Sequence, residues 1–298
     1  MAERRALVEW PTLLLLAACY AVWALATTAL AAFWLPLGMA TLVLAVTLHS
    51  SLQHEVLHGH PFRSRRLNEA LVFLPVGIFF PYGRFRDLHL AHHRDESLTD
   101  PYDDPESNYL DPKVWARLPG WLRLLLRANN TLLGRMALGP AISIFAVVRG
   151  DARAILGGDR AIARDWALHA AGLVLVGWWI ARAEMPVWAY LLSAYAGMSM
   201  LKIRTFLEHR AHDLARGRTV VVEGGWFLPF LFLNNNLHVV HHAKPGVAWY
   251  RLPALYAANR EDFLRRNDGY RYASYGEVFR RYFLKPKDPV PHPLRQRH

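Results

Sequence analysis

The chain of 298 residues is basic and apolar, with 35 Lys and Arg against 24 Asp and Glu and with 53% hydrophobic residues. Its length allows one or two domains, and its composition excludes a disordered or collagen-like chain. A net charge of +11 is common in nucleic-acid-binding proteins, but the sequence contains no nucleic-acid recognition module. We therefore expect no nucleic-acid partner and attribute the charge to attraction by anionic lipid headgroups, worth about 1 kcal/mol per nearby basic residue.

The N-terminal part of the chain carries the strongest membrane signal. Residues 10–54 include no Asp, Glu, Lys or Arg, a run long enough for two transmembrane helices of about 20 residues each. The sequence Leu35-Pro36-Leu37-Gly38 predicts a tight turn between antiparallel helices. The apolar run before it is too long for a cleaved signal peptide. Residues 12–58 are therefore predicted to form a first transmembrane hairpin.

A second hairpin is predicted within residues 164–212. Apolar segments at Trp166–Ala181 and Met185–Leu201 flank the polar sequence Arg182-Ala183-Glu184. At a rise of about 1.5 Å per residue the first segment is shorter than a hydrocarbon core of about 30 Å, so flanking charged side chains must reach the interface. The shorter apolar stretches Ala70–Pro81 and Met136–Val148 fit interfacial or re-entrant helices.

The positive charges predict the orientation of this topology. If only the two hairpins span, Arg182 is the one basic residue in the far-side turns. By the positive-inside rule both termini then lie in the cytoplasm. We expect an all-α integral membrane fold in a single domain, residues 1–298, with cytoplasmic segments at 59–163 and 213–298.

Three histidine clusters lie beside the apolar segments. They are His54-Glu55-Val56-Leu57-His58, His89-Leu90-Ala91-His92-His93 and His238-Val239-Val240-His241-His242. Spacings of three or four residues place imidazoles on one face of a helix, with Cβ atoms about 5–6 Å apart. The predicted topology brings all three clusters to the cytoplasmic side, together with His209 just after the fourth span. We therefore predict that these histidines bind metal ions.

The number and type of these side chains indicate which metal. Zinc takes three or four ligands, whereas nine imidazoles fit two six-coordinate first-row ions with open positions for oxygen or water. The lone Cys19 excludes a cysteine-based zinc or iron–sulfur site, and imidazole without thiolate suits iron. Glu55 and His58 have the Glu-x-x-His spacing but Glu208 begins no such pair, so the two pairs of carboxylate di-iron bundles are not both supplied.

Other polar residues are weaker candidates for the site. His212 lies one turn beyond His209 and is either a further ligand, an outer partner or solvated. Asn234, four residues before His238, is predicted to face the ligands and to hold a metal-bound water, although an asparagine here could instead cap the helix. Asp100 and Asp103 could accept the second N–H of a metal-bound imidazole, but a solvated turn is an equal alternative.

The remaining histidines are expected to lie outside the site. His60 is interpreted as local structure or surface, and His49 and His169 as buried or membrane-lining residues. His292 and His298, in a Pro-rich basic tail, are expected to be solvated.

The order and placement of the three clusters resemble the membrane-bound fatty acid desaturase superfamily, which includes acyl-lipid and acyl-CoA desaturases, carotenoid ketolases and related hydroxylases. The similarity runs from about residue 12 to 250. The segment Asn235-Asn236-Leu237-His238-Val239-Val240-His241-His242 resembles the third histidine box of bacterial members, which points to a bacterial inner membrane. The segment Arg204-Thr205-Phe206-Leu207-Glu208-His209 resembles the one that supplies a further ligand after the fourth helix.

This resemblance implies two non-haem iron ions that activate dioxygen as co-substrate. It implies that the catalytic and metal-binding residues are His54, His58, His89, His92, His93, His209, His238, His241 and His242. The chain shows no haem-binding fusion, ferredoxin pattern or dinucleotide fingerprint, so an external ferredoxin- or cytochrome-type donor with its reductase is expected to supply electrons.

We expect a desaturase that forms a C=C bond in an acyl chain of a lipid or related substrate. A lipid or carotenoid hydroxylase or ketolase with the same metal site is the alternative. A metal transporter or a non-enzymatic metal-binding membrane protein fits less well, because transport ligands lie within membrane spans.

Overall fold

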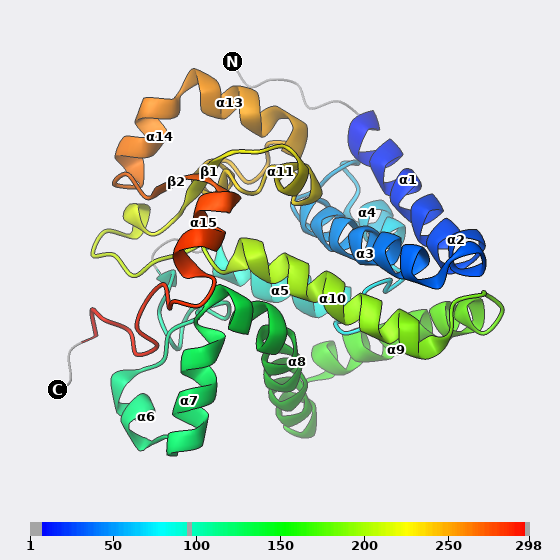
Figure 1. Ribbon diagram of the computed structural model, residues 1–298, viewed down its shortest axis with the longest axis horizontal. Coiled ribbons are helices and arrows are strands. Elements are labelled where there is room, and N and C mark those ends of the chain that lie inside the picture. The colour runs from blue at the N-terminus through cyan, green and yellow to red at the C-terminus, as the bar shows by residue number, and fades with distance from the viewer. Residues whose placement is uncertain (1–7, 94–96, 296–298) are drawn as a thin grey trace. The chain divides into compact units, whose positions relative to one another are not determined.

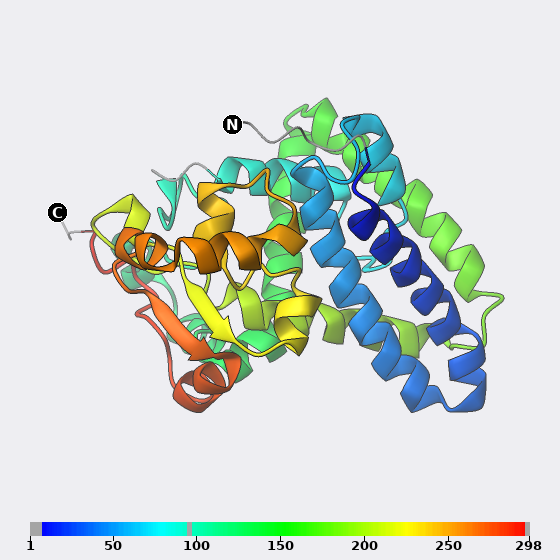
Figure 2. The same ribbon diagram turned by 90° about the horizontal axis from the view of Figure 1, so that it is seen from above.

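The computed structural model describes residues 8–93 and 97–295, which are mostly helical (Figures 1 and 2). The chain divides into two compact units. Unit 1 comprises Met1–Arg86 and Ile144–Met198, and unit 2 comprises Asp87–Ser143 and Ser199–His298. The predicted helical class is confirmed, apart from two short strands in unit 2 that the sequence did not predict.

The first predicted hairpin of unit 1 consists of α1 (Trp10–Thr27), α2 (Ala29–Phe33) and α3 (Leu35–Leu57), with α1 and α3 side by side in both views (Figures 1 and 2). The turn predicted at residues 35–38 is wrong, because the chain reverses at Trp34, which is extended, and Pro36 lies in the first turn of α3. A proline is well tolerated there since its missing N–H would have no helical partner. Gly38 allows the close approach, because a Cβ at this position would lie 2.7 Å from the Ala26 carbonyl oxygen.

The second predicted hairpin consists of α9 (Arg160–Ile180) and α10 (Val187–Thr205), joined by the predicted polar turn. Asp159 caps α9 by accepting hydrogen bonds from the Ala161 and Ile162 amides, both at 3.0 Å. The helix expected over Ala70–Pro81 is wrong: α4 (Arg65–Leu71) ends at its start, and the rest forms turns. Prolines and a glycine within this stretch interrupt helical hydrogen bonding.

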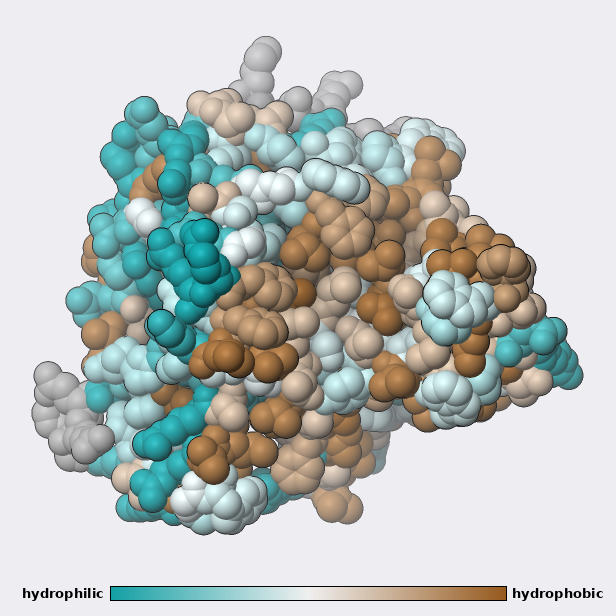
Figure 3. All heavy atoms as spheres, viewed as in Figure 1, coloured by the Kyte–Doolittle hydropathy of each residue, from teal (hydrophilic) through white to brown (hydrophobic). Residues whose placement is uncertain are grey.

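Among the described residues, three helical segments are long and apolar enough to cross a membrane: Trp10–Phe33, Leu35–Leu57 and Leu132–Leu156. The third, α8 (Leu132–Leu156), contains the apolar stretch expected to be interfacial but is a much longer helix. The four-span topology therefore stays a prediction. Figure 3 shows apolar side chains gathered over α1–α3 and α10, and hydrophilic ones over α14 and α15. Such exposed apolar surface is expected where lipid covers the helices.

Unit 2 builds a small sheet that supports the third histidine box. Strands β1 (Val221–Gly224) and β2 (Arg271–Ser274) pair in parallel. The segment before α12 (His238–Ala243) runs beside β1, where Val222 donates to the Asn236 carbonyl at 2.9 Å and Val239 donates to the Val220 carbonyl at 3.1 Å. Val239 and Val240 are fully buried. The box is therefore anchored by both hydrogen bonds and apolar packing.

The rest of unit 2 consists of short helices. They are α6 (Pro112–Arg117), α7 (Gly120–Asn129), η2 (Ala215–Gly217), α11 (Phe227–Leu231), η3 (Trp249–Arg251), α13 (Leu252–Ala258), α14 (Arg260–Arg266) and α15 (Tyr275–Tyr282). Helix α5 (Tyr82–His92) begins in unit 1 and carries the second box. Two of them have side-chain caps, since Asp111 accepts from the Lys113 amide at the start of α6 and Ser274 accepts from the Glu277 amide at the start of α15.

The basic C-terminal tail packs against the rest of unit 2. The expectation that His292 is solvated is therefore wrong. Its backbone amide donates to the Leu110 carbonyl at 2.8 Å, and its ring lies half-buried with Nε2 3.3 Å from the Thr99 hydroxyl. Arg295 pairs with Asp100 at 2.8 Å and with Asp111 at 3.1 Å. These carboxylates attract the tail's positive charge, which composition alone did not reveal. His298 lies outside the described residues.

Gly197 should be essential to the packing of α3 against α10 within unit 1. Its carbonyl accepts a hydrogen bond from the Thr47 hydroxyl at 3.2 Å, and a Cβ there would lie 2.7 Å from Cγ1 of Val46. We expect Gly197→Val to destabilise the protein by about 1–3 kcal/mol through overpacking, seen as a lower thermal unfolding temperature in detergent.

Gly150→Val is the matched control, because a Cβ at Gly150 meets no atom within 4 Å. Equal unfolding temperatures for both variants would contradict this account of the packing.

Candidate metal centre

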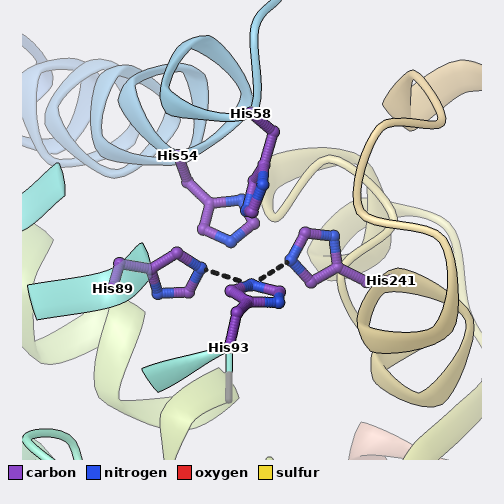
Figure 4. Close-up of side chains that lie close together, drawn as sticks. All are labelled: His54, His58, His89, His93 and His241. Carbon is purple, nitrogen blue, oxygen red and sulfur yellow. Dashed lines mark hydrogen bonds between the residues drawn. The ribbon is translucent and has the colours of Figure 1, made fainter. Parts of the chain in front are cut away.

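The first box places two imidazoles on the last turn of α3 in unit 1. His54 is buried within the helix and His58 is its C-cap residue. Their ring centroids lie 5.0 Å apart, and Figure 4 shows both rings extending from the end of α3. The four-residue spacing thus produces the shared face that the sequence predicted.

The second and third boxes supply a first cluster in unit 2, formed by His89, His93 and His241. Their ligand atoms lie within 4.8 Å of one another. Nε2 of His93 lies 2.9 Å from Nε2 of His89 and 3.1 Å from Nε2 of His241 (Figure 4). His89 belongs to α5, and the His93 amide continues the helical turn by donating to the His89 carbonyl at 3.1 Å.

A second cluster in unit 2 consists of His92, His209, His238 and His242, whose ligand atoms also lie within 4.8 Å of one another. Nε2 of His209 lies 2.8 Å from Nε2 of His92 and 3.1 Å from Nε2 of His238. The two clusters adjoin, since the rings of His93 and His242 stack with centroids 4.4 Å apart. Seven of the nine predicted ligands therefore converge within one compact unit.

His209 lies just after the fourth predicted span, as expected, but it is not on a helical turn. Helix α10 ends at Thr205, so His209 does not extend a helix but forms an isolated antiparallel bridge with Thr219. Its carbonyl accepts a hydrogen bond from the Lys287 ammonium at 2.9 Å. The C-terminal tail thus helps to hold this part of the second cluster.

The outer nitrogen of several imidazoles faces an acceptor. Nδ1 of His92 lies 2.7 Å from the Asp104 carboxylate, and Nδ1 of His89 lies 3.0 Å from the Glu106 carboxylate. Nδ1 of His238 lies 3.0 Å from the side-chain oxygen of Asn235. A carboxylate or amide oxygen can only accept, so each imidazole donates from Nδ1 and presents its Nε2 atom to the cluster.

These acceptors differ from those that the sequence suggested. Asp100 instead closes its own turn by accepting from the Tyr102 amide at 2.8 Å and the Asp103 amide at 3.1 Å, and Asp103 is exposed. Asp104 is buried and also accepts from the Thr99 amide at 2.8 Å. All of these carboxylates lie within one short acidic segment, so spacing gave no means of choosing among them.

Burial and mutual repulsion favour neutral imidazoles at His209 and His238 in the second cluster, whereas neighbouring carboxylates favour the protonated form of His92. Desolvation and the neighbouring imidazoles lower the pKa of His209 and of His238 well below the usual histidine range. Burial also acts to lower the pKa of His92, but the Glu106 and Asp104 carboxylates outweigh it and raise this pKa to about 9. Neutral imidazole is the form that binds a metal ion.

This donor set fits metal ions better than a hydrogen-bonded network. Nε2 of a protonated His92 can donate to Nε2 of His209, but the neutral His238, whose Nδ1 proton is directed outward, then also directs its Nε2 lone pair at this atom of His209. A cation between the nitrogens removes the repulsion. Several imidazoles without thiolate suit a first-row transition metal such as iron. The buried Cys19 lies in α1 of unit 1, where its Sγ donates to the Ala45 carbonyl.

The weaker candidates lie outside both clusters. Asn234 has a positive φ of 57° in the turn before α12, so it is not on that helix's face, and its amide donates to the Trp249 carbonyl at 3.0 Å. The neighbouring Asn235 contacts His238 instead. His212 lies 3.2 Å from the Asp268 carboxylate. The structure brings neither Asn234 nor His212 among the converging nitrogens.

Three further histidines are buried in unit 1. Nε2 of His49 lies 3.2 Å from the Tyr20 hydroxyl, and Nε2 of His169 lies 3.0 Å from the Ile78 carbonyl oxygen, as expected of core residues. His60 is completely buried, so of its two interpretations, local structure or surface, the surface one is wrong.

Comparison with known proteins identifies the family. A family model described as fatty acid desaturase matches residues 31–274. The chain belongs to the fatty acid desaturase family. This family member is also similar to a beta-carotene ketolase from Paracoccus sp., with 25% identity over 231 residues that cover 74% of each protein. The predicted family is confirmed, and with its apolar helices the chain is a membrane protein of the desaturase and ketolase superfamily.

Asp104 should control metal affinity in this family member without binding the ion. Asp104→Asn keeps the size of the side chain but removes the charge that holds Nδ1 of His92 at 2.7 Å. Loss of such an outer partner typically lowers metal affinity about 10–100-fold, which can be measured by competition with a chelator of known affinity.

Asp103→Asn is the matched control, because Asp103 is exposed in the same turn. If both variants bind metal as the wild type does, the role assigned to Asp104 is wrong.

Proposed function

We propose that this protein is an oxygen-dependent desaturase that introduces a C=C bond into an acyl chain of a lipid or related substrate at a non-haem di-iron centre. The convergence of seven imidazoles in two adjoining clusters carries the proposal. Membership of the fatty acid desaturase family supports it.

The proposed ligands of one ion are His92, His209, His238 and His242. Those of the other ion are His89, His93 and His241, and we propose that box one completes this set with His54 and His58. The support for box one is the pairing of its two rings on the last turn of α3. Asn234 and His212 are left out of both ligand sets because their side chains are engaged elsewhere.

When bound, the iron ions supply activation of dioxygen and removal of hydrogen from an unactivated C–H bond. The chain's own residues prepare the site for this chemistry. Asp104, Glu106 and Asn235 hold the Nδ1 protons of three imidazoles outward, so that the nitrogen lone pairs are preorganised. Burial of His92 and His238 excludes water from these nitrogens.

The membrane supplies the proposed substrate, and a separate protein supplies electrons. The apolar surface of the three candidate spans supports access for a lipid chain. We propose that the metal site and both termini face the cytoplasm of a bacterial cell, where an external ferredoxin- or cytochrome-type donor with its reductase delivers electrons. The excess of positive charge in the chain suits an acidic donor as well as anionic headgroups.

A ketolase or hydroxylase acting on a carotenoid or another lipid is the second candidate, favoured by the similarity to a beta-carotene ketolase. A transporter is disfavoured by the location of the ligands. The histidines of unit 2 lie in or directly after α5, in α12 and after α10, outside the three candidate spans. His54 lies in the last turn of the span Leu35–Leu57 and so at its end, whereas transport sites lie near the middle of the membrane.

His92→Ala should abolish the reaction. Its ring contacts both Asp104 and His209, so its removal takes a ligand and leaves a buried carboxylate without this partner. Lipids from cells expressing the wild type, but not the variant, should contain a product lighter than its precursor by two hydrogen atoms, as measured by mass spectrometry. Purified wild type should hold two iron ions per chain, and the variant fewer.

His212→Ala serves as the control and should retain activity, because His212 lies outside both clusters. A product heavier by one oxygen atom, or by one oxygen less two hydrogens, would replace the desaturase with a hydroxylase or a ketolase. Identical lipids in the wild-type and His92→Ala cells would reject all three reactions.

A further inference from the structure

Unit 1 contains a second buried group of ionisable side chains, next to box one but distinct from its histidines. Glu9 precedes α1, Glu55 lies in the last turn of α3, and His60 follows box one in the chain. They are 7%, 6% and 0% exposed. Nδ1 of His60 lies 2.5 Å from Oε2 of Glu9, and its Nε2 lies 3.8 Å from Oε1 of Glu55. The imidazole therefore lies between two carboxylates from different segments.

The backbone around His60 is held on both sides. Gly59, with a φ of 93°, turns the chain back immediately after His58. Pro61 then accepts a hydrogen bond from the Glu9 amide at 3.0 Å, and Val8 forms an antiparallel bridge with Phe62. The side chain of Asn68 bonds both the amide and the carbonyl of Phe62, each at 2.9 Å. The ring of His60 thus has little freedom to move.

Such a group is not explained by stability alone. Removing carboxylates from water costs several kcal/mol, and well-packed apolar side chains in their place often stabilise a protein as much or more. The group does, however, fix the orientation of the last turn of α3. Glu55 follows His54 directly and precedes His58 by three residues, so anchoring its side chain sets the rotation of the turn that carries both histidines.

We propose that His60 is a positioning residue that, through Glu9 and Glu55, orients His54 and His58 for metal binding. This inference rests on the proposed function, which makes those two histidines ligands. A third metal ion bound by Glu9, Glu55 and His60 is the competing interpretation. It is disfavoured because Nδ1 and Oε2 are in direct contact at 2.5 Å, closer than two atoms that each lie about 2.0–2.2 Å from a shared ion in regular geometry.

The test is titration of the metal-free, full-length protein in detergent with Co²⁺, followed by visible absorption, which reports coordination geometry. We expect the wild type to bind two ions. His60→Phe should weaken one of them about 10–100-fold and alter its spectrum, as loss of an outer partner does, while the other ion binds unchanged. His60→Asn can still donate from the position of Nδ1 to Glu9, and it should restore most of the affinity.

His169→Gln is the matched control, since it alters another buried histidine of unit 1 whose partner is the Ile78 carbonyl. Glu9→Gln keeps the size of the side chain and provides a second variant if His60→Phe does not fold.

Two results would overturn the inference. One is wild-type Co²⁺ affinity and spectrum in both His60→Phe and Glu9→Gln, or an equal loss in His169→Gln. The other is a third tightly bound ion in the wild type that disappears in Glu9→Gln. If instead the proposed function is wrong, the wild type itself will not bind two ions, and this result distinguishes the two cases.

Discussion

The convergence of imidazole nitrogens is the constraint on which unit 2 depends. Nε2 of His209 lies 2.8 Å from Nε2 of His92 and 3.1 Å from Nε2 of His238, whose Nδ1 atoms donate outward, and such nitrogens repel one another wherever no proton or metal cation lies between them. Burial strengthens this repulsion, because the low dielectric of the interior screens charges and dipoles poorly. A structure that holds such groups together is therefore organised for metal binding, and its surroundings must resist the tendency of the rings to separate.

The scaffold meets that requirement with connections from distant parts of the chain. Strand β1 holds the segment before α12, and the buried side chains of Val239 and Val240 fix the helix itself. The C-terminal tail crosses the acidic segment that provides Asp104, and Lys287 of this tail bonds the His209 carbonyl. Side-chain partners thus orient His89, His92 and His238, and backbone contacts hold His209 and the segment that carries the third box.

Imidazoles are paired with carboxylates in both units. In unit 2, Asp104 and Glu106 accept from imidazoles of the clusters, and in unit 1 Glu9 accepts from His60. A carboxylate paired with an imidazole is costly to bury but strongly directional. Its use at buried positions indicates that side-chain orientation, rather than stability alone, constrained these parts of the chain. Helices α1 to α3 face the opposite demand, because lipid requires apolar surfaces and internally satisfied backbones.

The sequence by itself determined the family, the helical class and the histidines that converge, because uncharged runs and three- or four-residue spacings are local properties of the chain. Only the tertiary structure decided which neighbours complete the site. Asp100, Asp103 and Asp104 are equivalent by spacing, and the fold of their turn alone buries Asp104 beside His92. The turn before α12 likewise places Asn235, and not Asn234, beside His238, and the chain reversal at Gly59 brings His60 to a buried position. Such contacts join residues far apart in sequence or depend on backbone turns, so local patterns carry no record of them.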